Sequence, residues 1–516
     1  MFGHAYAGAA GLKYLLVGIV VVWNIFHFPN VNYTNSNKYN HLGTVYTAQR
    51  NFTVAHDHEA DAEIVKFWQD FAAILHDARP QIKPIKLGKG KPAAKYMSYK
   101  KMIEDDPPRV ERLNLSEKDE DVMYHAHRLM RDSARTLAAR VPYRQNTYGI
   151  VMTAGTKLMP VLLVSLRLIR RTGTTLPIEV WLGSRAEYDR DLCELLTTFN
   201  AQCRIISDIY EHANAAPLTK YQFKIFSILF SSYENVMFLD ADSFPINDPT
   251  SLLTSEPYIS HGLVTWPDTW ASTTSASYYA IADIPEVPVS TRISTESGQL
   301  LINKRTHSAA LLMSVYYNYY GPDHYYKLLS QGSYGAGDKE TFLPAAMVMD
   351  APFYQVKTPL TILGRPRNGK MLIIAMAQHH PTEDWFNPPS HPSYQRVEPS
   401  KTVSAKEKPK ILFIHHNVMK LDPREILRSK LKGRLRDKNG KFQRMWVRDH
   451  EDVLGRDVEK EIWEVVREEA CRTDEKVCGE VGEYFKAVFG DDVNDMDDMD
   501  IAEGEVAGKR KWKSRT

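Results

Sequence analysis

A short, wholly apolar run in the middle of the chain limits the folds that this sequence can adopt. Residues Val236-Met237-Phe238-Leu239 contain no polar side chain, whereas a strand with one solvent-facing side would alternate apolar and polar residues. Such a run is typical of a strand buried on both faces, as in a parallel sheet covered by helices. The sequence therefore predicts an α/β domain that contains this strand.

Two aspartates directly follow the apolar run. Asp240 and Asp242 are separated by one residue, so their side chains share one side of an extended backbone. In open α/β sheets, ligands bind at the carboxyl ends of the strands, where this pair is expected. Carboxylate oxygens suit Mg²⁺ or Mn²⁺, and such an ion suits a diphosphate. Two solvated turn aspartates are the simpler alternative, but the position after a buried strand favours a metal site.

Strand and helix patterns alternate ahead of this run. The first strand contains Gly155, but its surroundings match neither G-x-G-x-x-G nor G-x-x-x-x-G-K, which argues against a dinucleotide site and a P-loop. The alternation predicts a parallel sheet with right-handed crossover connections. Strands are expected at residues 148–155, 178–182, 204–207 and 236–239, and helices at 158–171, 186–199 and 220–233.

Two histidine pairs compete to complete the predicted metal site. His415 and His416 follow another apolar strand, expected at 411–414, and an imidazole at that strand end could join the two aspartates. His379 and His380 form the second pair.

Three carboxylates are candidates for the reaction centre. Glu296 precedes a strand expected at 300–303, and a glycine-rich turn that would let backbone approach a ligand precedes Asp338 and Glu340. Capping of a neighbouring segment is the alternative role for Glu296 and Asp338. The aromatic stretch 266–270 is expected to form a loop.

The N-terminal region has the pattern of a membrane anchor. Residues 12–28 are predominantly apolar, at the short edge of the length that spans a bilayer. No small-x-small cleavage site follows, so we expect an uncleaved signal anchor with residues 1–11 in the cytosol. Three N-x-[ST] sequons lie beyond it, where a lumenal stem would be glycosylated: Asn32, Asn51 and Asn114. Helices are expected at 59–78 and 116–140, and whether they pack on the α/β domain stays open.

Composition argues against one class of partner, the nucleic acids, and bears on the state of the cysteines. Its 516 residues carry a net charge of +2 with no basic motif, so nucleic-acid binding is not expected. Four cysteines form two close pairs in sequence, which would be two disulfides in an oxidising compartment and buried thiols in the cytosol: Cys193 with Cys203 and Cys471 with Cys478.

Taken in order, the motifs resemble those of the fungal Golgi α-mannosyltransferases of glycosyltransferase family 71. The similarity covers about 148–422 through Y-G-I-V-M-T-A-G, F-L-D-A-D, E-S-G-Q, G-D-K-E-T-F and F-I-H-H-N followed by Lys420. It implies a GT-A catalytic fold, a Rossmann-like sheet that binds a nucleotide sugar between flanking helices. It also implies a type II single-pass Golgi membrane protein, GDP-mannose as donor, a mannosylated glycan as acceptor, and Mn²⁺, with Mg²⁺ as the alternative. Because GDP-mannose and the family's products are both α-linked, the implied reaction retains configuration.

The resemblance also implies roles for individual residues. Asp240 and Asp242 would bind the metal and the donor diphosphate, and Asp338 and Glu340 would face the acceptor. His415 stays the candidate for the third metal ligand, and Glu296 joins Asp338 and Glu340 as a candidate for a catalytic role, as nucleophile or positioning group. The linkage, α-1,2 or α-1,3, and the route of retention stay open. The donor would contact Gly155, Thr153, Lys220, Lys224, Asp240, Gln299 and Lys420.

The implied domain order is a cytoplasmic tail (1–11), an anchor (12–28), a lumenal stem with helices (29–142), the catalytic domain (143–425), a helical extension (426–486) and a disordered tail (487–516). A GT-A enzyme that uses a UDP-sugar is the alternative within the same class. An inactive lumenal lectin or scaffold and a cytosolic nucleotidyltransferase are alternatives from other classes. The intact D-x-D pair argues against the lectin, and the anchor with its sequons argues against the cytosolic enzyme.

Overall fold

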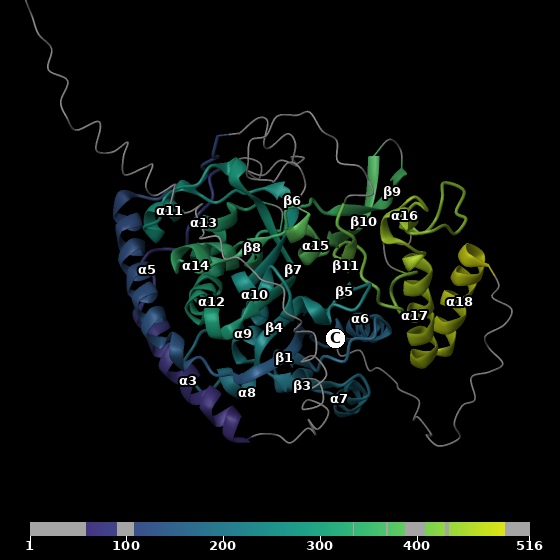
Figure 1. Cartoon of the computed structure of the whole chain (residues 1–516), viewed down its shortest axis with the longest axis horizontal. Helices are drawn as coiled ribbons and strands as arrows, with labels where there is room; N and C mark the ends of the chain where they lie inside the picture. The colour runs from purple at the N-terminus through teal and green to yellow at the C-terminus, as the bar shows by residue number, and fades with distance from the viewer. Residues whose placement is uncertain are drawn as a thin grey trace, which may run out of the picture. The chain divides into compact units, whose positions relative to one another are not determined.

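Four of the seven strands in the large sheet are adjacent and parallel, as the alternation of strand and helix patterns predicted. We call these four strands the parallel half of the sheet. The computed structural model describes residues 58–89, 108–333, 335–367, 370–387, 408–428 and 433–490, which belong to one compact unit beginning at Asp57. The strand order is β3-β2-β1-β4-β7-β6-β8 (Figure 1). Strands β1 to β4 are mutually parallel, β7 is antiparallel to both of its neighbours, and β8 is parallel to β6. The bounds are β1 Arg144–Thr153, β2 Ile178–Leu182, β3 Ala201–Ile205, β4 Tyr233–Asp240, β6 Leu263–Ala271, β7 Ile293–Asn303 and β8 Tyr354–Gln355.

Strand β4 is buried on both faces, which confirms the reading of its apolar run. Val236 and Phe238 pack into the hydrophobic core on one face of the sheet, and Met237 and Leu239 pack into the core on the other. None of the four side chains is exposed to solvent. Alternation of the side chains therefore divides this strand between two cores, and Asp240 emerges at its carboxyl end.

Helices cover the sheet on both faces. Trp68 shows how α3 is attached: its indole stacks on Tyr210 with ring centroids 4.8 Å apart and donates to the Tyr210 carbonyl at 2.8 Å. The two helices predicted in the stem therefore pack on the α/β unit. The helices before and within the parallel half are α3 His58–Asp77, α5 Glu117–Leu137, α6 Met159–Arg171, α7 Arg190–Thr197, α8 Ser207–Tyr210 and α9 Gln222–Phe230. Those that follow, up to β9, are α10 Tyr258–His261, α11 Ala276–Ala282, α12 Lys304–Tyr319, α13 Tyr326–Ser330 and α14 Phe342–Val348.

A second, antiparallel sheet lies beside the first and was not expected from the sequence. Its order is β5-β11-β10-β9, with bounds β5 Ser243–Pro245, β9 Thr361–Arg367, β10 Lys370–His379 and β11 Ile411–His415. Strand β5 follows the aspartate pair and is hydrogen-bonded to β11, so Ser243 lies opposite His415. The short helix α15 spans Pro381–Phe386.

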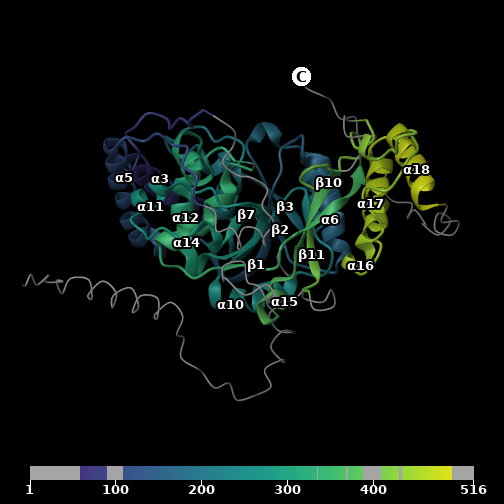
Figure 2. The same ribbon diagram turned by 90° about the horizontal axis from the view of Figure 1, so that it is seen from above.

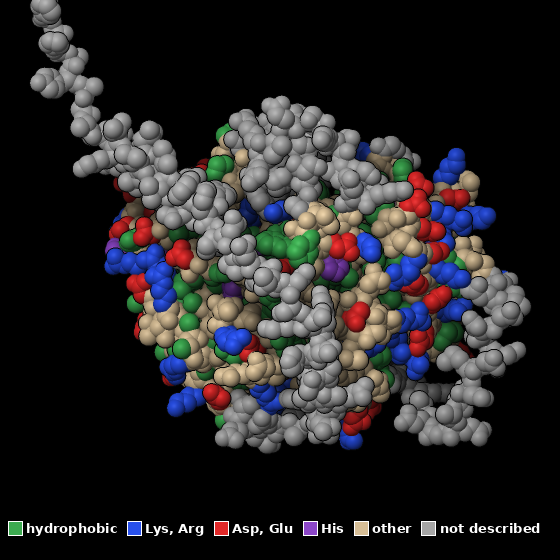
Figure 3. All heavy atoms as spheres, viewed as in Figure 1, with side chains coloured by type: hydrophobic (Ala, Val, Ile, Leu, Met, Phe, Trp, Pro, Cys, Tyr) green, Lys and Arg blue, Asp and Glu red, His purple; other side chains and the backbone are tan. Residues whose placement is uncertain are grey.

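Helix α17 of the C-terminal region packs against α6. Helix α16 spans His450–Leu454, α17 Val458–Thr473 and α18 Glu475–Phe489. Arg167 and Arg171 of α6 form ion pairs with Glu468 and Glu464 of α17, at 2.8 Å and 3.1 Å. In two perpendicular views, α17 and α18 lie on the opposite flank of the sheet from α3 and α5 (Figures 1 and 2). Positive and negative side chains are intermixed over this C-terminal flank (Figure 3).

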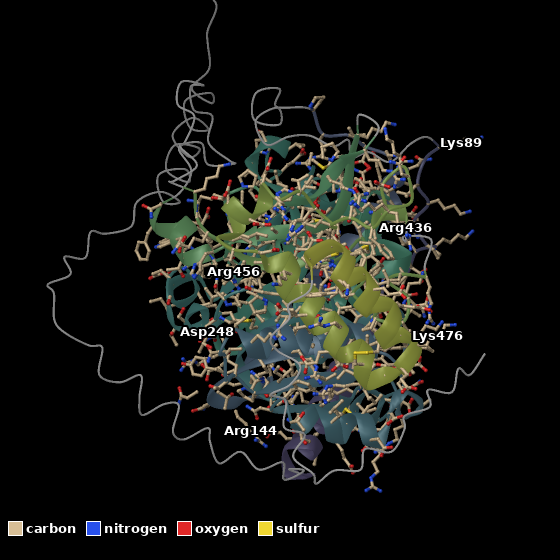
Figure 4. All side chains as sticks on the ribbon, turned by 90° about the vertical axis from the view of Figure 1, so that its right-hand side faces the viewer. Lys89, Arg144, Asp248, Arg436, Arg456 and Lys476 are labelled. Atoms are coloured by element: carbon tan, nitrogen blue, oxygen red, sulfur yellow. A yellow bond between two sulfur atoms is a disulfide. The ribbon has the colours of Figure 1, made fainter. Side chains whose placement is uncertain are left out.

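Both cysteine pairs are disulfides, which decides between the two alternatives that the sequence left open. Cys193 of α7 is bonded to Cys203 of β3, and Cys471 of α17 to Cys478 of α18. The second bond lies where the two C-terminal helices meet, near Lys476 (Figure 4).

Several sequence predictions were wrong in detail. Ser207, expected in the third strand, begins α8, and β4 begins at Tyr233, where a helix was still expected. The stretch 266–270 is part of strand β6 rather than a loop, and β7 starts at Ile293 instead of residue 300. Proline and polar residues hid both strands, because the pairing of β6 with β7 shifts register there and tolerates them. Helix α18 continues to Phe489, so disorder does not begin at residue 487.

Several predictions concern residues outside the described part of the chain. They are the anchor at 12–28, the sequons at Asn32 and Asn51, and the tail after residue 490. The third sequon is described, and Asn114 is exposed. Among the described residues, no helix has both the length and the apolar character needed to cross a bilayer.

Candidate active site

A cavity of about 610 Å³ opens at the carboxyl end of β4. We call it the strand-end cavity. Asp240 and Asp242 lie in its wall, together with residues from β1, β7, β10 and the segment after β11. The position agrees with the rule that ligands of α/β sheets bind beyond the carboxyl ends of the strands.

The structure brings Asp240, Asp242 and His415 together at this cavity. Each offers a ligand atom, and these atoms all lie within 4.8 Å of one another. Pairing of β5 with β11 sets the distance, because Ser243 opposite His415 is the residue next to Asp242. The backbone N–H of His416 also donates to the carbonyl of Asp242 at 2.8 Å. Two carboxylates and an imidazole form a donor set that suits Mn²⁺.

Of the four candidate histidines, only His415 joins this cluster. His416 points the other way: it stacks on Phe244, its Nδ1 bonds the Met419 carbonyl at 3.1 Å, and burial lowers its pKa to about 4. The Nδ1 of His379 bonds the Pro409 carbonyl, and the side chain of His380 caps α15. The sequence could not separate the doublet, because only the strand register decides which ring faces the cavity.

The two aspartates differ in their electrostatic surroundings. Burial raises the pKa of Asp242, but His415 and Lys420 outweigh it and hold that pKa below its usual value. The Nε2 of His415 lies 3.3 Å from Asp242 Oδ1, and the Lys420 ammonium contacts Oδ2. For Asp240, burial dominates and raises the pKa, while Lys224 opposes the rise.

Lys224 connects Asp240 to Asp338 in the cavity wall. Its ammonium lies 3.1 Å from Asp240 Oδ1 and 3.0 Å from Asp338 Oδ2, and it donates to the Ser297 carbonyl at 2.7 Å. Burial lowers the pKa of Lys224, but the two aspartates more than compensate and raise it above its usual value. The lysine is therefore a fixed positive charge between two carboxylates.

The three predicted reaction-centre carboxylates occupy different environments. Asp338 and Glu296 line the cavity, whereas Glu340 does not. Glu340 is 1% exposed, and its carboxylate accepts hydrogen bonds from Arg292 at 2.6 Å and from the Thr295 N–H. The structure thus gives Glu340 the surroundings of an internal ion pair rather than an acceptor-facing position, because Arg292 is buried beside it.

The predicted donor-contacting residues also separate into two groups. Thr153, Lys220, Lys224, Asp240 and Lys420 line the cavity.

Gly155 and Gln299 do not line it. A Cβ at Gly155 would lie 2.5 Å from Glu187 Oε1, so the missing side chain leaves room for a carboxylate of the chain itself. Gln299 is fully buried and donates to Glu296.

Sequence reasoning missed a buried ion pair in the cavity wall. Lys339 donates to Asp268 Oδ2 at 2.7 Å and to Ser294 Oγ at 3.0 Å. Lys339 stands between two residues that the sequence did single out, but nothing marked Asp268, which lay in a predicted loop.

Asn417 supports the idea that the cavity holds a polar ligand. Its side-chain oxygen is buried and has no hydrogen-bond partner among the described residues, although the residue lines the cavity. A buried acceptor of this kind normally has a partner, so a bound group that donates to it is the simplest explanation.

Comparison with known sequences identifies the family. The family model Mannosyl_trans3, described as "Mannosyltransferase putative", matches residues 147–292 and 288–380. The α-1,2-mannosyltransferase MNN21 of Candida albicans is 31% identical over 472 residues, which cover 79% of this chain and 70% of the relative. The α-1,2-mannosyltransferase MNN2 of Saccharomyces cerevisiae is 31% identical over 434 residues, covering 72% and 70%.

These matches place the chain in the mannosyltransferase class. The chain belongs to the family of fungal α-1,2-mannosyltransferases represented by MNN21 and MNN2, which confirms the resemblance seen in its motifs.

Solved structures offer only distant likenesses. The galactosyltransferase LgtC, in complex with donor and acceptor sugar analogues, is 15% identical with a TM-score of 0.28 and covers 42% of this chain and 76% of that one. The glycosyltransferase GlyE of Streptococcus pneumoniae is 12% identical with a TM-score of 0.27 and covers 40% and 45%. The assignment to the family therefore rests on the sequence relatives.

Proposed function

We propose that this protein transfers mannose from GDP-mannose to an α-mannoside on a glycan, with retention of configuration and with a divalent metal ion. The observation that carries the proposal is the cluster of Asp240, Asp242 and His415 in the wall of the strand-end cavity. The relatives are named α-1,2-mannosyltransferases, so we propose the α-1,2 linkage for the product.

The donor set of the cluster fits Mn²⁺. When bound there, the ion would neutralise charge on the diphosphate leaving group. Lys420 beside Asp242 adds a second positive charge, available to a phosphate that displaces it from the carboxylate. The unpartnered oxygen of Asn417 is an acceptor that belongs to the same cavity.

Asp338 is the carboxylate that we assign to the transferred sugar. It lines the cavity, and its Oδ2 is held by Lys224 at 3.0 Å and by Ser297 Oγ at 3.0 Å, so its position is fixed before substrate binds. Such an anchored carboxylate can act as the nucleophile of a double displacement. It can also stabilise the positive charge that develops at the anomeric carbon during same-face attack.

We also propose that the fold is of the GT-A type and that the enzyme works in the Golgi lumen as a type II membrane protein. The support for the location is the apolar segment at residues 12–28 and the sequon at the exposed Asn114. Two disulfides in the α/β unit agree with an oxidising compartment.

Sugar transfer by a chain secreted from Asn30 onward tests the proposal. It receives GDP-mannose, α-mannobiose and Mn²⁺, beside an Asp242→Ala variant and a sample treated with EDTA. We expect an α-1,2-linked mannotriose from the untreated protein, a loss of at least 100-fold in the other two, and recovery when Mn²⁺ is restored to the EDTA sample.

Other outcomes would contradict the proposal in distinct ways. Transfer from a UDP-sugar but not from GDP-mannose would assign a different donor. Undiminished transfer in EDTA would show that the reaction needs no metal ion. Folded protein that is silent with every donor would favour a lectin or scaffold.

A further inference from the structure

We propose that the segment Glu296-Ser297-Gly298-Gln299 is a cradle that orients His415 toward the metal, with Glu296 as the positioning residue. This inference rests on the proposed metal dependence and goes beyond it, because it assigns Glu296 a role outside the chemical step. We call these four residues the β7 cradle.

The first observation is the contact between Glu296 and the ring of His415. Nδ1 of His415 lies 2.9 Å from Glu296 Oε1, and both side chains are buried. A carboxylate can only accept, so this nitrogen carries the proton and donates it to Glu296. The other nitrogen, Nε2, faces the aspartates and lies 3.3 Å from Asp242 Oδ1. By the same rule it carries a proton in the metal-free protein, and a bound cation would take the place of that proton. Histidine ligands of metals in proteins are commonly oriented in this way by a carboxylate on the far nitrogen.

The second observation is the space that Gly298 leaves. A Cβ at this position would lie 2.4 Å from His415 Nδ1 and 2.9 Å from Glu296 Oε1, closer than real Cβ contacts. The N–H of Gly298 also donates to Glu296 Oε1 at 2.7 Å. Position 298 therefore admits only glycine while the ring of His415 stays where it is.

The third observation is that Glu296 is itself held from behind. Gln299, fully buried, donates to Glu296 Oε2 and accepts from Ser243 Oγ at 3.1 Å. Ser243 follows Asp242 directly and is paired with His415 across β5 and β11. Hydrogen bonds thus run from Ser243, the neighbour of Asp242 in the chain, through Gln299 and Glu296 to His415.

An irregularity in β7 makes this arrangement possible. Val264 pairs with Leu301 and Trp266 with Glu296. A step of two residues along β6 therefore matches a step of five residues along β7. Glu296 and Gly298 share one side of the strand by simple alternation, and the irregularity lets Gln299 reach Glu296 as well. Ser297 faces the other way and holds Lys224 and Asp338.

These contacts also argue against Glu296 as the nucleophile. Both of its oxygens accept hydrogen bonds from the chain, one from His415 and Gly298 and the other from Gln299. To attack the sugar, the carboxylate would have to release the histidine that it orients. Of the two candidate carboxylates that line the cavity, Asp338 is therefore the one that is not hydrogen-bonded to a proposed metal ligand.

Binding of Mn²⁺, rather than activity alone, tests the cradle. The full-length protein in detergent, with GDP present, is titrated with Mn²⁺, and the free ion is followed by electron paramagnetic resonance. The variants are Glu296→Gln, Gly298→Ala and Asp242→Ala. The matched control is Glu179→Gln, which changes a buried carboxylate of β2 that holds Trp181 and Ser232 and does not line the cavity. Thermal unfolding shows that each variant is folded.

We expect Glu296→Gln and Gly298→Ala each to weaken Mn²⁺ binding by about 10- to 100-fold, with the control unchanged. In transfer assays, we expect activity of Glu296→Gln to recover at high Mn²⁺, because the ligand is misplaced but still present. If Glu296→Gln binds Mn²⁺ as tightly as the unaltered protein and loses its kcat at every Mn²⁺ concentration, the positioning role is overturned and Glu296 acts in the chemical step. If the unaltered protein itself binds no Mn²⁺ and transfers mannose without it, the proposed metal dependence fails first and the inference fails with it.

Discussion

Individual side chains show that the cavity is built from charges paired before any ligand arrives. Lys224 lies between Asp240 and Asp338, and Lys339 is bonded to Asp268, all in or beside the cavity wall. Removing one partner of such a pair leaves a buried charge alone, which costs about 3–5 kcal/mol in proteins. Substitutions in this site can therefore destabilise the fold as well as reduce activity. The folding of each variant has to be measured beside its activity.

One buried carboxylate away from the cavity gives a test of pH dependence. Burial raises the pKa of Glu459 from 4.5 to about 8, against the opposing effect of a hydrogen bond from the Met445 N–H. The native state thus holds a proton at neutral pH that the unfolded chain releases. The contribution of Glu459 to the free energy of unfolding is complete below about pH 4.5 and is lost as the pH rises toward 8.

The Glu459→Gln substitution removes that titration. We compare the free energy of unfolding of this variant with that of the unaltered protein. We expect the difference to shift in favour of the variant by about 3 kcal/mol between pH 5 and pH 8. Urea denaturation at several pH values measures it, with Glu483→Gln, an exposed change on α18, as the control. A pH dependence that is the same with and without the Glu459 carboxyl would contradict the assignment.

At the scale of elements, the parallel half of the sheet was predictable and the antiparallel half was not. Strands β1 to β4 and their helices follow simple rules of period and burial, and the D-x-D pair follows from the end of β4. Strand β6 and the first part of β7 were missed because Pro267 and the polar run at 294–299 lie where the pairing of these strands shifts register. The same shift places the β7 cradle, so the contacts of Glu296 and Gly298 could not be read from spacing. His415 was named as a ligand, but its choice over His416 required the register of β5 and β11.

The disulfide between α7 and β3 makes a further prediction. Cys193 and Cys203 close a loop of 10 residues at β3, which is an edge strand of the large sheet. Because the cross-link restricts the unfolded chain, we expect the Cys193→Ser/Cys203→Ser variant to lose about 2–3 kcal/mol of unfolding free energy. Denaturation with and without reductant measures the loss. Reductant should shift the unaltered protein toward the variant, and a variant as stable as the oxidised protein would refute the expectation.

Over the whole molecule, the helices that precede the sheet are part of its core. Trp68 and Phe71 of α3 pack with Phe226 and Phe230 of α9 in one continuous hydrophobic cluster. Helix α5 buries Met123 and Met130 in the same cluster. The catalytic unit is therefore larger than the segment that carries its motifs, and it begins near Asp57.

Two truncated chains test that boundary. A chain from Asp57 should fold and unfold cooperatively, whereas one from Arg144, which keeps every strand, should aggregate because the core under α3 and α5 is uncovered. Circular dichroism melting and size-exclusion chromatography compare them. A monomeric chain from Arg144 with an unchanged melting temperature would show that these helices are dispensable.

The pairing of β5 with β11 has a consequence for how such an enzyme would respond to its surroundings. The backbone ladder sets Asp242 beside His415, so the ligands do not need an ion to bring them together. On the proposed function, the protein would be made and folded in full when manganese is scarce. Scarcity would then lower the turnover of each molecule and leave the number of molecules unchanged, and a restored supply would return activity within the time that an ion takes to bind.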